Sequence, residues 1–263
     1  MQVAMVVPDA VLDPSLFAAL AVRMLVAVSV GLAPVFPGVP WRLRGALAVL
    51  LTAAAVPAAV RAWPAAAPLP AVLAGEAVVG LGLGFAVAAV LAAAAWAGSL
   101  LGSVSGLAWA GDFDPQADGE EAGMARLAWW LGLGGFLAAG GHLAVVTGFV
   151  DSIRGVPVGC WLGDAAARAG LADLVTGVVS TAFGLAIAVA LPALAAVVAA
   201  HAAGAVCMRT IRFEPGQGIP QTVATLVLVG CLLLGTEGWI RGFGVAATDR
   251  VERCFVPPSG SIR

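Results

Sequence analysis

The sequence predicts an all-α, polytopic membrane-type protein. Its 263 residues are 61% apolar and only 11% charged, whereas soluble domains carry about 25% charged residues. Apolar runs recur along the whole length, and at roughly 18 residues or more each is long enough for a helix that crosses a bilayer. Pro or Gly stands in each connection between the runs, as expected of residues that end helices.

We expect about six long apolar helices. They cover residues 12–34, 43–60, 71–101, 124–149, 172–208 and 222–247. Asp13-Pro14-Ser15 suits the start of the first helix, since a capping side chain there lies beside a proline. Straight helices over 71–101 and 172–208 would reach about 46 and 55 Å, beyond a hydrocarbon core of about 30 Å. We therefore expect these helices to pack against protein as well as lipid.

Charge and cysteine content exclude several classes of protein. The net charge is −2 without a basic tail, which argues against nucleic acid as a partner. The cysteines show no Cys-x-x-Cys spacing, so we expect neither a metal site nor a disulfide framework; they are Cys160, Cys207, Cys231 and Cys254. The chain contains no Lys, so it has no phosphate-binding loop of the P-loop kind. The N-terminus lacks the basic start of a cleavable signal. No cofactor is expected.

Several polar residues lie inside or near the ends of apolar segments. Arg23 and Glu76 stand out, because a charge at the middle of a span costs about 3 kcal/mol and therefore needs a partner or a wet surface. Interhelical hydrogen bonding is the interpretation that we favour for both, over an ion relay in a transporter. His201 is expected to be structural, and Glu237 to be a solvated carboxylate near the interface.

Small residues recur at every fourth position on two stretches. Gly80 and Gly84 form the first, and Gly98, Gly102 and Gly106 the second; this spacing lines one face of a helix. Membrane helices use such faces to bring backbones close together, although an Ala/Gly-rich chain also contains them by composition. The second stretch leads into an acidic segment with Asp112, Asp114, Asp118, Glu120 and Glu121.

The fragment Ser103-Val104-Ser105-Gly106 invites comparison with intramembrane serine proteases. Such chemistry needs a Ser and a His within hydrogen-bond reach, together with oxyanion donors. His142 and His201 are the available histidines, but Ser103 stands where the rhomboid-like Gly-x-Ser-Gly has its first glycine. We therefore expect that the chain is not an enzyme.

An ordered set of motifs runs through most of the chain. It comprises Arg23, the segment "APVFPGVP" at 33–40, Glu76-x-x-x-Gly80-x-x-x-Gly84-Phe85, the set Gly98, Gly102, Gly106, Asp114 and Pro115, the triplet Gly140-Gly141-His142, and Ser152, Pro157 and Gly159. Their order and spacing resemble the FliR family of flagellar type III export-gate proteins, which is related to the SctT subunits of injectisomes. The resemblance runs from about residue 16 to about residue 235, and His142 favours the flagellar branch.

The C-terminal part departs from this family pattern. Residues 212–221 contain an apparent extra "EPGQG" before Pro220-Gln221, and Thr222-Val223 follow. The family has Pro-Gln-Leu-Asn here and a later Lys. Any contact that the family makes through that Asn and Lys is therefore in doubt.

The resemblance implies a core channel-forming subunit of the flagellar type III protein export apparatus. Its helices would form packed hairpins in a helical export gate with P-type and Q-type subunits and the B-type export switch protein. Residues 1–170 would be the P-type-like part and 171–263 the Q-type-like hairpin with a C-terminal tail. Unfolded flagellar proteins would be the exported cargo. The bacterial inner membrane, at the flagellar basal body, would be the location.

The resemblance also implies a channel plug near residues 107–119. Trp109 and Phe113 would exclude water, since apolar constrictions can gate a pore, and Asp114-Pro115 would belong to the same loop. The five glycines of the two stretches would be helix-packing residues. An ordinary solvated loop is the alternative to a plug. For the whole chain, the alternatives are an injectisome SctT-type subunit and a small proton-coupled secondary transporter using Arg23 and Glu76, although the internal repeats usual in transporters are not evident.

Overall fold

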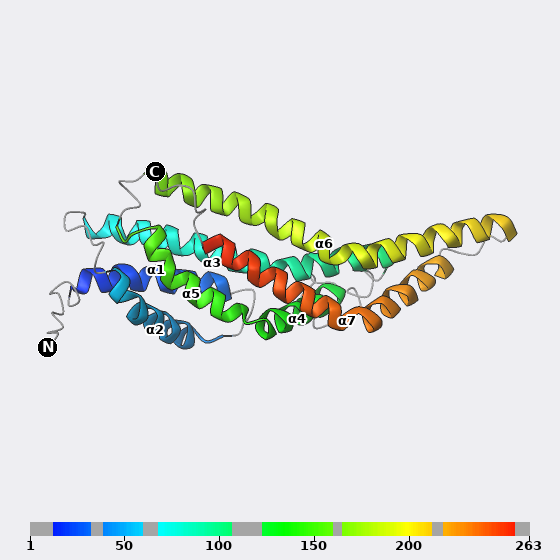
Figure 1. Cartoon of the computed structure of the whole chain (residues 1–263), viewed down its shortest axis with the longest axis horizontal. Coiled ribbons are helices and arrows are strands. Elements are labelled where there is room, and N and C mark those ends of the chain that lie inside the picture. Colours follow the sequence, from blue (N-terminus) through cyan, green and yellow to red (C-terminus); the bar gives the residue numbers. More distant parts are fainter. Residues whose placement is uncertain are drawn as a thin grey trace, which may run out of the picture. The chain divides into compact units, whose positions relative to one another are not determined.

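The described residues form seven α-helices in the computed structural model (Figure 1). The structure describes residues 13–32, 39–59, 68–106, 123–159, 165–211 and 218–255, and no strand occurs within these ranges. The helices are α1 (Pro14–Leu32), α2 (Trp41–Ala59), α3 (Leu69–Ser105), α4 (Gly123–Ala138), α5 (Gly141–Gly155), α6 (Ala165–Ile211) and α7 (Gly218–Phe255). Among the described residues, α1, α2, α3, α6 and α7 contain spans apolar and long enough to cross a membrane, and α4 with α5 passes the same test as a pair. The predicted all-α, polytopic membrane-type fold is confirmed.

The chain divides into two compact units. The first unit comprises Met1–Ala89, His142–Val179 and Asp249–Arg263, and the second comprises Val90–Gly141 and Ser180–Thr248. Each of the long helices α3, α6 and α7 contributes residues to both units. This division groups residues by packing, and the predicted boundary at residue 170 between a P-type-like and a Q-type-like part stays a prediction.

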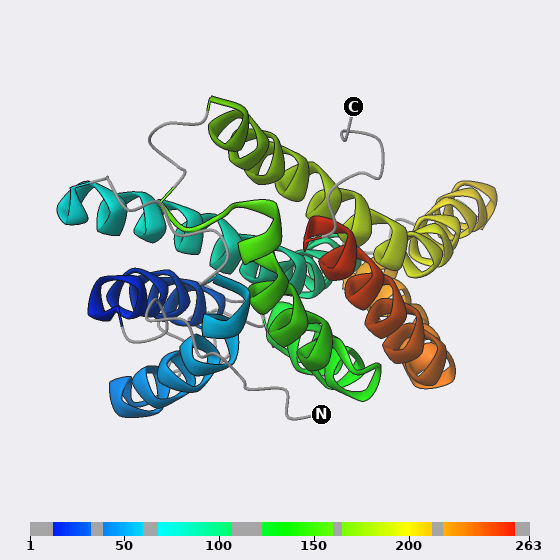
Figure 2. The same ribbon diagram turned by 60° about the vertical axis from the view of Figure 1, so that its left-hand side comes forward.

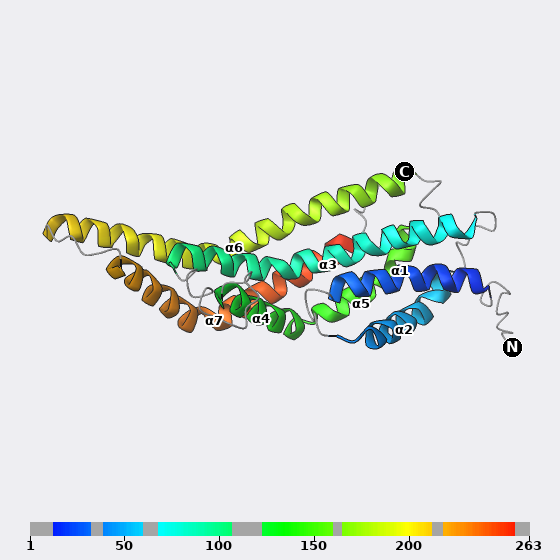
Figure 3. The ribbon, with the colours of Figure 1, turned by 180° about the vertical axis from the view of Figure 1, so that it is seen from behind.

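The first unit is built on the pairing of α1 with the beginning of α3. The two helices lie side by side in Figures 1 and 3, and α2 packs against α1 (Figure 2). Helix α1 begins where the sequence indicates, since the backbone N–H of Ser15 donates to Oδ1 of Asp13 at 2.9 Å, a capping contact. The facing sides of α1 and α3 are buried, with Leu20, Met24 and Val79 at most 1% exposed.

The second unit is built on α4, which packs against the end of α3 and against α7. Helix α4 approaches α7 closely at Gly135, where an added Cβ would meet the backbone oxygen of Ile240. Phe243 of α7 is buried and lies against Gly132 of α4. The aromatic rings of Trp96 and Phe183 stack with centroids 4.6 Å apart, and this contact joins α3 to α6.

The predicted helix over 124–149 is divided into α4 and α5. Gly140 lies between them with φ of 78°, in the left-handed region that glycine adopts without a steric penalty. Its N–H donates to the carbonyl of Leu137 at 3.1 Å, so it ends α4 as glycine commonly ends helices. The apolar run continues across Gly140 and Gly141, and hydropathy alone therefore did not reveal the break.

Candidate functional site

A buried ion pair joins α1 to α3 in the first unit. Nε of Arg23 lies 2.5 Å from Oε2 of Glu76, and the two side chains are 0% and 1% exposed. Hydrogen bonds between ionised partners are the stronger kind. The two intramembrane polar residues that the sequence singled out separately are therefore brought together by the fold.

The pair also holds the segment that follows α5. Nη1 of Arg23 donates to the carbonyl of Val156 at 2.9 Å, and the N–H of Gly159 donates to Oε1 of Glu76 at 2.9 Å. Gly159 has φ of 80°, which is conformationally accessible to glycine. One ion pair thus holds three parts of the chain together: α1, α3 and the turn over residues 156–159.

The backbones of α1 and α3 approach each other closely, and this approach brings Arg23 and Glu76 within reach. A Cβ on Gly80 would meet the carbonyl oxygen of Arg23, and one on Gly84 would lie 2.6 Å from the carbonyl oxygen of Ala27. Gly80 and Gly84 follow Glu76 by one and two helical turns. Because these positions carry no side chain, α3 can lie close enough to α1 for Glu76 to reach Arg23.

The chemistry of the pair favours a structural role. Each carboxylate oxygen of Glu76 accepts a hydrogen bond from a fixed donor. Nη2 of Arg23 has no hydrogen-bond partner within the described residues. Removing one member of such a pair leaves an uncompensated buried charge, so the pair specifies how these elements pack.

In the second unit, α4 and α7 pack around the end of α3, and we call these contacts the frame. A Cβ on Gly98 would lie 2.5 Å from the backbone oxygen of Met124, and one on Gly102 would lie 3.2 Å from Cβ of Met124. The first turn of α4 therefore packs against the last turns of α3. Residues 107–122, which connect these two helices in the sequence, lie outside the described residues.

Helix α7 contributes to the same frame. Nε2 of Gln221 donates to the carbonyl of Gly106 at 3.0 Å, and Oγ1 of Thr225 donates to the carbonyl of Ser105 at 3.2 Å. Gly106 has φ of 78° and ends α3. The sequence analysis noted Gln221 only as part of the Pro220-Gln221 motif and predicted neither contact; a further signal was the pair of polar residues four positions apart at the start of an apolar helix.

The remaining predicted site residues have varied surroundings. Trp109, Phe113, Asp114 and Pro115 lie outside the described residues. The hydroxyl of Ser105 donates to the carbonyl of Gly102 in its own helix at 3.3 Å. Glu237 is exposed and pairs with Arg241 one turn later, and His201 is half-buried. In the described part of the chain, no three His, Cys, Asp or Glu side chains gather as a metal site requires.

The comparison with known protein families gives a match over most of the chain. A family model described as "Bacterial export proteins, family 1" matches residues 15–215, about three quarters of the 263-residue chain. The match contains both members of the buried pair and the three glycines at the end of α3, and it ends before α7. No curated protein shows a significant match. The chain therefore belongs to family 1 of the bacterial export proteins.

Proposed function

We propose that the chain is a core channel-forming subunit of the flagellar type III protein export apparatus. It assembles with P-type and Q-type subunits, and with the B-type export switch protein, in the bacterial inner membrane at the flagellar basal body. Membership of the export family supports a component of a type III export gate. The observation that carries the proposed assembly is the large apolar surface that α6 and α7 leave uncovered.

Helices α6 and α7 are longer than a bilayer is thick, and their own chain leaves their most apolar windows largely uncovered. The spans that contain these windows are 35 and 33 residues long, about 50 Å each as helices, and the span in α7 also carries the exposed ion pair of Glu237 and Arg241. A bilayer has a hydrocarbon core of about 30 Å. Only 28% and 11% of the most apolar windows of α6 and α7 are buried by their own chain, and the side chain of Leu234 is 93% exposed. Contact with other protein chains accounts for the excess.

The glycines of α6 and α7 support the same conclusion. A Cβ added at Gly184, Gly204, Gly230, Gly235 or Gly238 would meet no atom within 4 Å. In membrane proteins, small residues on a helix face allow a second helix to approach closely. These positions are therefore available to helices of other subunits, as expected if residues 171–263 form the Q-type-like hairpin.

The loop over residues 107–119 is the proposed plug of the channel. Its support is the resemblance to FliR proteins together with the frame at its base, where α3, α4 and α7 are held by Gly98, Gly102 and Gln221. Trp109 and Phe113 are the residues proposed to exclude water. Shortening this loop in an assembled complex should make the membrane permeable to small ions. Unchanged ion permeability in a complex of normal composition would contradict the plug.

A clean deletion in the native host tests the function directly. The expected result is loss of flagellar hook and filament proteins from the culture medium, and restoration of secretion by the wild-type chain. Normal secretion in the deletion strain would reject the flagellar assignment. Loss of secretion of injectisome substrates instead would identify the SctT-type alternative.

A second candidate, a proton-coupled secondary transporter, would use the buried pair of Arg23 and Glu76 as its coupling site. A coupling carboxylate must release and take up a proton, so Glu76→Gln would abolish its transport. Glu76→Gln also leaves the Arg23 guanidinium buried without a counter-charge and replaces one of the two accepting oxygens by an N–H donor, so activity is compared only in variant complexes that assemble normally. Complete loss of activity in a Glu76→Gln complex that assembles normally would favour the transporter.

A further inference from the structure

An exposed ion pair lies near the middle of α7, between exposed apolar side chains. Nη2 of Arg241 is 2.5 Å from Oε1 of Glu237 one helical turn earlier, and both side chains are 78% exposed. Leu234 and Val245, which are 93% and 65% exposed, stand three residues before the pair and four residues after it. Residues three and four apart share a face of a helix, so the four side chains form one surface, which we call the mid-α7 face.

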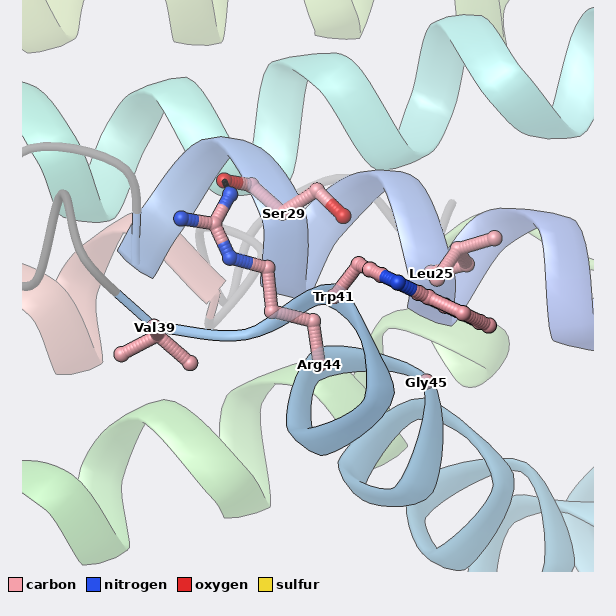
Figure 4. Close-up of a pocket in the computed structure, with 6 residues that line it drawn as sticks. All are labelled: Leu25, Ser29, Val39, Trp41, Arg44 and Gly45. Atoms are coloured by element: carbon pink, nitrogen blue, oxygen red, sulfur yellow. Dashed lines mark hydrogen bonds between the residues drawn. The ribbon is translucent and has the colours of Figure 1, made fainter.

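The arginines of α1 and α2 are placed differently, because each makes a polar contact with another helix of its own chain. Arg23 pairs with Glu76 of α3. Nη1 of Arg44 donates to the carbonyl of Ser29 of α1 at 3.5 Å, beside the cavity shown in Figure 4. Glu237 and Arg241 instead pair along a single helix, and the chain leaves the outer side of the pair uncovered.

Neither water nor lipid alone is a suitable environment for the whole mid-α7 face. Water solvates the ion pair but leaves the side chain of Leu234 in contact with water. Lipid covers Leu234 but exposes two charges to hydrocarbon, which is costly. A boundary between lipid and water accounts for apolar side chains on one side of the pair, whereas here they lie on both sides. A protein surface with charged groups among apolar side chains is complementary to the entire face.

We propose that the mid-α7 face docks on a helix of another protein chain, which carries a basic side chain opposite Glu237 and an acidic side chain opposite Arg241. The inference rests on the proposed assembly with other subunits and adds the chemistry of one contact in it. Such complementary charges fix the register of two packed helices, which a wholly apolar face does not do. A Cβ at Gly238 would meet no atom within 4 Å, so the backbone beside the pair is open to a close approach.

Exchange of the two charges tests the proposal. Glu237→Arg combined with Arg241→Glu keeps the ion pair and the net charge but presents the charges in the opposite order. The melting temperature of the isolated chain should stay unchanged, since exposed pairs contribute little to stability. Co-purification with tagged P-type and Q-type subunits from native membranes should fall about tenfold or more, because like charges then meet across the contact.

Asp249 and Arg253 provide the matched control. They form a second exposed pair on α7, with the same spacing and with the acid first. Their neighbours Arg250 and Glu252 are exposed and charged, so water is a sufficient environment there. Asp249→Arg combined with Arg253→Asp should leave co-purification unchanged. An equal loss in the two exchange variants would overturn the proposal, because the effect would not be specific to the mid-α7 face.

Glu237→Leu combined with Arg241→Leu distinguishes a protein contact from a lipid contact. A face covered by lipid tolerates this replacement, whereas the proposal expects co-purification to fall, because the charges of the partner helix would be buried without counter-charges. Unchanged co-purification of this variant or of the Glu237 and Arg241 exchange, where the wild type recovers both subunits, would overturn the contact and leave the proposed assembly intact. Failure of the wild-type chain to recover either subunit would reject the proposed assembly, and this contact with it.

Discussion

The most apolar windows of helices α3 and α6 have the same hydropathy, yet the chain itself covers them to different extents. The most apolar window of each has a mean hydropathy of 2.4, but 67% of that window is buried in α3 and 28% in α6. Along α3, Gly80, Gly84 and Gly98 lie against the backbones of neighbouring helices, whereas Gly184 and Gly204 of α6 meet nothing. Hydropathy therefore identifies a helix without saying what covers it. The close contacts identify helices that are packed within their own chain.

The largest effect is expected from breaking the polar contact that holds α3 to α1. Arg23→Ala leaves the Glu76 carboxylate buried and unpaired, and it should lower the free energy of unfolding by about 3–5 kcal/mol. Thermal unfolding of the purified chain in detergent measures this loss. Arg154→Gln removes an exposed ion pair and should leave the melting temperature unchanged, as surface pairs usually contribute little. Equal stability of Arg23→Ala and the wild type would show that the ion pair does not stabilise the packing of α1 against α3.

Overpacking a glycine distinguishes α3 from α6. In Gly84→Leu, even the Cβ lies 2.6 Å from the oxygen of Ala27 and 2.8 Å from Cβ of Val30, so α3 must move away from α1. We expect a loss of about 1–3 kcal/mol or more, measured by the same melting experiment.

Gly184→Leu, in α6, is the matched counterpart of this variant. It should leave the isolated chain as stable as the wild type and should reduce co-purification with P-type and Q-type subunits. If Gly184→Leu destabilised the isolated chain as much as Gly84→Leu, the contrast between the two helices would be wrong.

A smaller effect is expected at the frame in the second unit. Gln221→Ala removes one hydrogen bond to the carbonyl of Gly106 and should cost about 1 kcal/mol. Hydrogen exchange at the end of α3 should increase, while exchange at α1 stays unchanged. Faster exchange at α1 as well would indicate that the two units unfold together.

A partial rescue is expected when both charges of the buried pair are replaced. Arg23→Met combined with Glu76→Met should recover part of the stability lost in Arg23→Ala, since apolar residues can replace a buried ion pair, but the carbonyl of Val156 and the N–H of Gly159 lose their hydrogen bonds to the pair. Secretion of flagellar proteins should then be largely retained. Recovered stability without any secretion would show that the charges serve export itself, which contradicts a structural role.

Much of the fold could be predicted because long apolar runs leave a strong signal. The start of α1 at Asp13-Pro14 and the positions of the long helices followed from it. The break between α4 and α5 did not, because Gly140 and Gly141 interrupt an apolar run that continues on both sides. The two consecutive glycines and the polar His142 were the signal that could have located it.

The candidate site was only partly predictable. Arg23 and Glu76 were singled out because charges are rare in apolar helices, but their pairing across 53 residues depends on the fold. Their other partners, the carbonyl of Val156 and the N–H of Gly159, are backbone groups, and every residue has such groups. The hydrogen bond from Gln221 to Gly106 could not be predicted for a different reason: a polar residue at the start of a helix is most often solvated.

We infer that other protein chains cover α6 and α7. Site-specific photo-crosslinking from position 234, in native membranes containing tagged P-type and Q-type subunits, tests it most directly, because Leu234 of α7 is 93% exposed in the isolated chain. Position 101 is the control, since Leu101 of α3 is 1% exposed and should crosslink only within the chain. We expect adducts with P-type or Q-type subunits at position 234. Adducts with lipid alone at that position would contradict it.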